Sequence, residues 1–110
     1  MIIDRDENIT IITQETAKIP QLVEKIQQSY EKFKNDNIIV NLSSLGKLKL
    51  EDIIEFLEVS NKHRKAKHSF VIVASDFNFD DAPDEIVIVP TTQEAYDIIE
   101  MEEMERDLGF

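Results

Sequence analysis

The sequence predicts an α/β fold, in which a mainly parallel β-sheet carries an N-terminal hairpin and three main helices. Two observations support this fold class. Short apolar runs of strand length alternate with segments whose apolar residues recur at helical spacing, and chain breakers are scarce, with 2 glycines and 3 prolines. The expected order of elements is β-β-α-β-α-β-β-α. With 110 residues, the chain has room for one domain, which spans residues 1–110.

The first two strands are expected to form the hairpin. Residues 2–5 and 9–13 are β-prone runs that flank the polar segment Asp6-Glu7-Asn8, which is typical of a turn. Three further runs, at residues 38–42, 70–74 and 86–89, are almost continuously apolar. This character favours strands that are covered on both faces, as the strands of a parallel sheet are.

Two amphipathic segments predict the helices between these strands. The first lies near residues 20–35, where Pro20 suits an initial helical turn because its missing N–H costs nothing there. The second runs from about residue 50 to residue 65. Its expected core-facing stripe consists of Leu50, Ile53, Ile54 and Leu57.

The last predicted helix opens at residues 91–94, where Thr91 and Glu94 have the spacing of a capping box. We expect its core-facing stripe to be extended to the end of the helix by further apolar residues. An alternative interpretation assigns that extension to an anionic contact surface, because methionine adapts to partner surfaces as well as filling cores. The stripe consists of Ala95, Ile98 and Ile99, and its extension of Met101, Met104 and Leu108.

The charge of the chain is concentrated near its end. The formal net charge is −11, from 12 Lys and Arg against 23 Asp and Glu. Residues 1–75 hold 11 acidic and 11 basic side chains, whereas residues 76–110 hold 12 acidic side chains and one basic residue, Arg106. Such a surface repels nucleic acid and anionic membranes but suits a basic protein partner. With 0 cysteines, no spanning apolar run and no signal peptide at the start, a cytoplasmic protein is expected.

The residues that usually carry catalysis or metal binding do not form recognisable motifs here. His63 and His68 are five positions apart, and we expect both to face solvent at a basic helix end. Ser43 and Ser44 do not lie in a nucleophile elbow, and two glycines cannot supply a phosphate-binding loop. We therefore expect no catalytic residue, no metal site, no cofactor and no small-molecule substrate.

The segment 76–85 is acidic but lacks the residue order of a calcium-binding EF-hand loop. A solvated loop is expected there, with Phe77 or Phe79 packed onto the core.

The segment from residue 38 to residue 73 resembles the STAS domain, the family of sulfate transporters and anti-sigma factor antagonists. Asn41-Leu42-Ser43 is similar to the Asp-Leu-Ser that ends a hydrophobic strand in that family, with Asn in place of Asp. The segment Ile86-Val87-Ile88-Val89-Pro90-Thr91-Thr92-Gln93-Glu94-Ala95 is similar to the family's last strand and its Thr-x-x-Glu-Ala helix start. The resemblance spans nearly the whole chain and implies a STAS-like domain.

The resemblance also implies a regulatory protein that works by protein–protein contact rather than catalysis. In the antagonist branch a partner kinase phosphorylates a serine where the second helix begins, and this blocks docking. That position falls on Lys49-Leu50-Glu51-Asp52, which has no hydroxyl, so the usual switch is not expected. Ser43 and Ser44 are the nearest hydroxyls and therefore the candidate phosphorylation sites.

The resemblance places the candidate docking surface at the loop and helix start between residues 43 and 52. The implied partner is an anti-sigma factor or kinase, or a PP2C-type phosphatase, in a bacterial cytoplasm. The candidate partner-binding residues are Ser43, Ser44, Lys47, Lys49, Glu51 and Asp52.

The alternative from a different class is an enzyme. The ending at residues 102–110 resembles that of small bacterial proteins labelled ribonuclease Z, a zinc-dependent nuclease that processes tRNA. That nuclease needs a His-x-His-x-Asp-His cluster, and this chain has 2 histidines in all, so it cannot build that zinc site and is expected to be at most a companion of the nuclease. Stoichiometric zinc and cleavage of a tRNA precursor by the pure protein would establish the enzyme.

Overall fold

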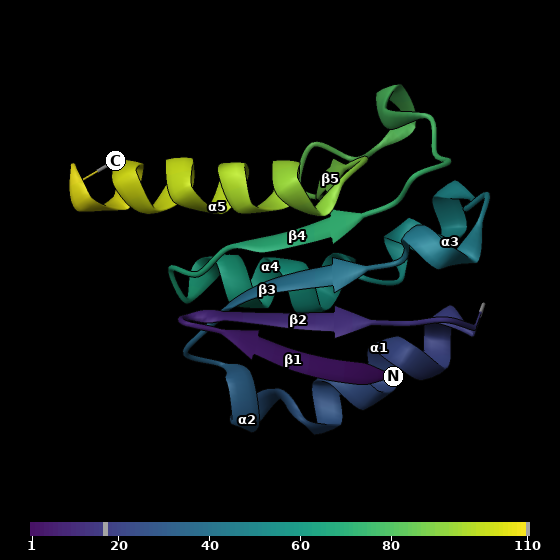
Figure 1. Ribbon diagram of the computed structural model, residues 1–110, viewed down its shortest axis with the longest axis horizontal. Helices are drawn as coiled ribbons and strands as arrows, with labels where there is room; N and C mark the ends of the chain where they lie inside the picture. The colour runs from purple at the N-terminus through teal and green to yellow at the C-terminus, as the bar shows by residue number, and fades with distance from the viewer. Residues whose placement is uncertain (17, 110) are drawn as a thin grey trace.

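One five-stranded mixed sheet organises the protein in the computed structural model, which describes residues 1–16 and 18–109 (Figure 1). The strands lie in sequence order across the sheet. They are β1 (Ile2–Asp6), β2 (Ile9–Thr13), β3 (Asn37–Asn41), β4 (Phe70–Val73) and β5 (Val87–Val89). The helices are α1 (Ile19–Gln28), α2 (Tyr30–Phe33), α3 (Leu50–Ile54), α4 (Leu57–Lys65) and α5 (Thr92–Asp107), with short 3₁₀ turns at Ser43–Leu45 and Phe79–Asp81.

The predicted α/β class is confirmed, as a compact domain with this mixed sheet. The hairpin strands β1 and β2 are antiparallel, and the other three neighbouring pairs are parallel. Each expected strand is present, with ends that differ from the prediction by a residue or so. The two early helices are each divided in two, the first at Ser29 and the second at residues 55–56, where the Phe56 N–H bonds the Ile53 carbonyl three residues back.

The two faces of the sheet are covered by different helices. On one face the aligned residues Ile12, Val40 and Ile72 pack with residues of α1, α3 and α4 in the larger core. On the other face Ile39 and Val71, aligned with each other, pack under α5 in a smaller core. Register therefore decides which helix each strand residue meets, because adjacent strand residues point to opposite faces.

The second helical stripe is the first correction to the sequence prediction. Ile53 is buried, but Leu50 and Ile54 are 39% and 45% exposed. The helix is interrupted at residues 55–56, so a stripe drawn along one continuous helix does not describe which side chains face the core. The core is instead reached by Ile53, Phe56, Val59, Ser60 and His63.

The end of α5 is the second correction. Ala95 and Ile99 are buried as expected, but the exposed fractions of Met101, Met104 and Leu108 are 49%, 60% and 72%. A helix of 16 residues is about 24 Å long, whereas the four residues of β4 span about 13 Å. Figure 1 shows α5 antiparallel to β4, with its last turns extending past the ends of the strands. Met101, Met104 and Leu108 lie on the side of α5 opposite Ala95, Ile99 and Arg106, which face the sheet, so the core cannot bury them.

The acidic segment between β4 and β5 is a loop that carries the Phe79–Asp81 turn, as predicted. Phe77 packs against the larger core, whereas Phe79 is exposed. Within the described ranges 1–16 and 18–109, no helix is both long enough and apolar enough to cross a lipid bilayer.

Strand β1 forms one edge of the sheet, and all five of its residues are exposed. Across the β1–β2 pair, Arg5 stands opposite Thr10, and both side chains reach the carboxylate of Asp36 at the start of β3. Arg5 donates two hydrogen bonds of 3.0 Å, and the Thr10 hydroxyl donates a third of 2.8 Å. Burial alone would raise the pKa of the Asp36 carboxyl, but these donors outweigh it and hold the pKa below its ordinary value. Asp36 therefore ties the edge strand to the middle of the sheet.

Substituting Asp36→Ala is expected to lower the free energy of unfolding by roughly 1–3 kcal/mol, because the buried Thr10 hydroxyl loses its acceptor. Urea unfolding followed by circular dichroism measures this loss. Glu31→Ala is the matched control, since it breaks the exposed Glu31–Lys34 ion pair of 2.7 Å and should change stability little. Equal losses in the two variants would show that the Asp36 cluster adds nothing beyond an exposed ion pair.

Candidate functional site

The carboxyl ends of the parallel strands are the usual location for sites in α/β sheets, because the connecting loops gather there. In this protein the loop after β3 meets the loop after β4 at the carboxyl ends of the strands. The hydroxyl of Ser75 donates a 3.2 Å hydrogen bond to the backbone carbonyl of Ser43. Lys47 and Asp76 form an isolated parallel bridge, and Leu48 N–H donates to the carbonyl of Asp76 at 3.3 Å. The segment 43–49 is thus bound to the end of β4 at two places.

Asn41 fixes the beginning of this loop. Its side-chain oxygen accepts a 3.0 Å bond from the backbone N–H of Ser43 and a 2.7 Å bond from the Ser43 hydroxyl. Such an Asn-centred turn shapes the backbone locally, because the side chain replaces a backbone acceptor. An aspartate could accept the same bonds but would add a charge, so the Asn forms this turn without one.

The rest of the loop is shaped by Gly46 and Leu48. Gly46 has a φ of +74°, a backbone conformation that residues with a Cβ rarely adopt. Leu48 is buried and anchors the loop in the larger core. Asp52 then accepts a 3.0 Å bond from the backbone N–H of Lys49, which satisfies one free donor where α3 begins.

The six predicted partner-binding residues all lie on this loop and the start of α3, which we call the 43–52 surface. Asp52 is half-buried, and the other five, Ser43, Ser44, Lys47, Lys49 and Glu51, are exposed. Sequence reasoning missed the contribution of Leu50 and Ile54, which it assigned to the core. They are four positions apart on α3 and give the surface an exposed apolar part.

His63 is the clearest correction among the candidate residues, because it was expected to face solvent and is fully buried. Its Nε2 lies 2.7 Å from the backbone carbonyl of Asp36, and its Nδ1 lies 2.6 Å from the Tyr30 hydroxyl. A carbonyl can only accept, so Nε2 carries the proton and Nδ1 accepts from the tyrosine. His68, which is half-buried, stacks on the His63 ring with centroids 5.3 Å apart.

Burial lowers the pKa of His63 to about 4, since desolvation outweighs the hydrogen bond to the Asp36 carbonyl that favours the charged ring. His63 lies near the amino ends of the strands, at the opposite end of the sheet from the 43–52 surface. Its contacts to α2 and to the start of β3 give it a structural role. The signal for its burial was its spacing from Ile53, Phe56 and Ser60, which recur at helical intervals; the neighbouring basic residues masked it.

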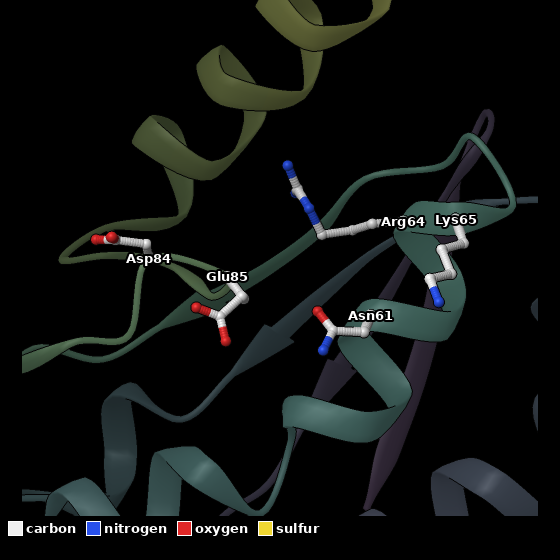
Figure 2. Close-up of a pocket in the computed structure, with 5 residues that line it drawn as sticks. All are labelled: Asn61, Arg64, Lys65, Asp84 and Glu85. Atoms are coloured by element: carbon white, nitrogen blue, oxygen red, sulfur yellow. The ribbon is translucent and has the colours of Figure 1, made fainter.

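A shallow open depression of about 460 Å³ lies between α4 and the segment that leads into β5. Figure 2 shows Asn61 and Glu85 facing one another across it, while Arg64 extends toward α5. There Arg64 pairs with Glu102 at 3.2 Å. Two cationic and two anionic side chains therefore line a depression with no excess charge. Its lining residues are Asn61, Arg64, Lys65, Asp84 and Glu85.

Metal ligands do not gather in the part of the chain that the structure describes, where no group of three or more His, Cys, Asp or Glu side chains could hold an ion. A scan of protein-family models finds no match to this chain, and a search of curated proteins finds no match either.

The His63 ring is expected to remain neutral until the pH approaches about 4. Because this folded-state pKa lies below the ordinary 6.5, the unfolded chain binds the proton first, and His63 lowers the stability of the fold as pH falls from about 6.5 toward 4. A two-dimensional NMR titration of the two histidines measures the midpoints directly. A His63 midpoint near 6.5 would contradict its burial. In a His63→Gln variant, the fall in unfolding free energy over this pH range should become shallower.

Proposed function

We propose that this protein is a non-enzymatic regulatory module of the anti-sigma factor antagonist type, which acts in the cytoplasm by docking a protein partner on the 43–52 surface. The observation that carries the proposal is the construction of this surface. Its backbone is held by Asn41, the end of β4 and a buried Leu48, while its side chains are exposed. A fixed backbone with exposed side chains lowers the entropy cost of binding.

The chemistry of the surface is that of a small protein interface. Leu50 and Ile54 supply exposed apolar area, and the charged residues Lys47, Lys49, Glu51 and Asp52 lie next to them in the sequence, on the loop and the first turn of α3. An apolar centre with a polar rim is the common anatomy of protein–protein contacts. The partner class we propose is an anti-sigma factor or kinase, or a PP2C-type phosphatase.

We propose further that docking proceeds without a phosphoserine switch at the helix start. The acidic residues there have a local structural explanation. Asp52 caps the backbone N–H of Lys49, and Glu51 in the first turn complements the helix dipole. The hydroxyl of Ser43 donates to Asn41, so a phosphate on that oxygen would break the turn that shapes the loop. Ser44 is the candidate whose modification would add charge without that loss.

Reversing one charge and removing one of the two exposed apolar side chains of the 43–52 surface tests the proposal. A Lys49→Glu, Leu50→Gln variant is expected to bind its partner at least tenfold more weakly, which corresponds to about 1.4 kcal/mol. The partner is first isolated from native cytoplasm with the wild-type chain as bait and identified by mass spectrometry. Dissociation constants of the purified pair are then measured by calorimetry. Lys25→Glu, Lys32→Glu is a control with exposed charges on α1 and α2, and it should bind normally.

The salt dependence of association provides an independent test. Lys47 and Lys49 offset Glu51 and Asp52, so docking on the 43–52 surface should have an association rate that changes little with ionic strength. Stopped-flow or surface-binding kinetics at low and high salt measure it. A steep loss of rate with salt, abolished by neutralising acidic residues of α5, would show that this partner docks on α5 instead.

A further inference from the structure

The outer face of α5 carries apolar side chains that the core does not use. Met101, Met104 and Leu108 follow one another at intervals of three and four residues, which places them along one side of a helix. We call these three residues the α5 stripe. The stripe lies on the side of the helix turned away from the buried residues Ala95 and Ile99, and its exposed fraction rises from 49% at Met101 to 72% at Leu108.

The spacing of the stripe is that of the a and d positions in paired helices. With Met101 and Leu108 at a and Met104 at d, the flanking g and e positions are Glu100, Glu105 and Asp107. All three are acidic and exposed. Charges at e and g positions select the partner helix by attraction or repulsion across the interface.

No cation on α5 offsets this acidity. Arg106 is the one basic residue after position 75, and it points into the protein. Its guanidinium donates to the Ser69 hydroxyl at 3.2 Å and to the side-chain oxygen of Asn37 at 3.3 Å. Acidic residues in the last turns also oppose the helix dipole, so they do not stabilise the helix that carries them.

We propose that the α5 stripe is a second docking surface, which packs against a basic amphipathic helix of a partner protein. That helix presents apolar residues at a and d spacing and Lys or Arg at the flanking positions. Methionine suits such a surface because its flexible side chain adapts to different apolar partners. A second copy of this chain does not fit, because two α5 helices would bring acidic e and g positions together. Anionic membranes are repelled for the same reason.

This surface is distinct from the 43–52 surface and extends beyond the function proposed above. Since α5 runs antiparallel to β4, its C-terminal end lies near the amino ends of the strands (Figure 1). The 43–52 surface lies at their carboxyl ends. The two surfaces are therefore at opposite ends of the sheet, and each can be altered without the other.

The test uses a synthetic helical peptide of about three heptads with Leu at a and d and Lys at e and g, added to the full chain. We expect measurable binding that weakens as salt rises, because part of the attraction is between charges. Substituting Met101→Gln and Met104→Gln should weaken binding at least tenfold. Neutralising Glu100→Gln and Glu105→Gln should weaken it at low salt and flatten its salt dependence. Fluorescence anisotropy measures the affinities, and circular dichroism checks that each variant is folded.

Two controls separate this proposal from general attraction to an acidic protein. Asp80→Asn, Asp81→Asn makes the same change of charge in the loop before β5 and should leave binding unchanged. A peptide with Glu in place of Lys at e and g should not bind. The proposal is overturned if the peptide fails to bind, if the methionine variant binds as well as wild type, or if the Glu peptide binds equally. Sedimentation showing a dimer that Met104→Gln dissolves would overturn it in favour of self-association. None of these outcomes bears on the 43–52 surface, which its own variant tests.

Discussion

The hydrogen-bonded cluster around Asp36 and His63 is the constraint on which the rest of the structure depends. The Asp36 carboxylate holds the two hairpin strands to β3, and its backbone carbonyl accepts from His63 of α4. His63 in turn accepts from Tyr30 of α2. Contacts from β1, β2 and α4 thus meet at Asp36, and α2 is joined to them through His63. Because buried polar groups are costly unless satisfied, these elements have one arrangement in which every donor finds its acceptor.

The polar cluster that stabilises the protein lies at one end of the sheet, and the 43–52 surface proposed to bind a partner lies at the other. The polar network occupies the amino ends of the strands, whereas the 43–52 surface is built at the carboxyl ends on the core residue Leu48 and on turns that use Asn41 and Gly46. The end of α5 is secured by a different set of bonds, from Arg106 to Asn37 and Ser69. Each candidate surface therefore has its own support, and the side chains proposed to bind partners carry little of the fold.

The sequence predicts where the helices and strands lie better than it predicts which of their side chains are buried. Strand runs and the hairpin are visible because apolar runs and polar turns are local signals. The second helical segment is interrupted at residues 55–56, and Phe56 and His63 both reach the core. The predicted stripe through Leu50 and Ile54 was therefore wrong. The exposure of Met104 follows from its place on the side of α5 opposite Ala95 and Ile99, a helical spacing that the predicted stripe overlooked. The residues of the 43–52 surface were found through a family resemblance, and whether they bind a partner stays a prediction.

The exposed edge strand has a consequence for how the protein behaves in a crowded cell. Strand β2, with the sequence Ile-Thr-Ile-Ile-Thr, has the composition of segments that form cross-β aggregates. In the folded protein β1 covers its outer edge, and the charges of Asp4, Arg5 and Asp6 make β1 itself a poor template for another chain. By fastening the hairpin to Asp36, Arg5 therefore also helps to keep β2 paired along both of its edges. Local fraying of a few residues at the N-terminus, rather than global unfolding, would be the first step toward aggregation.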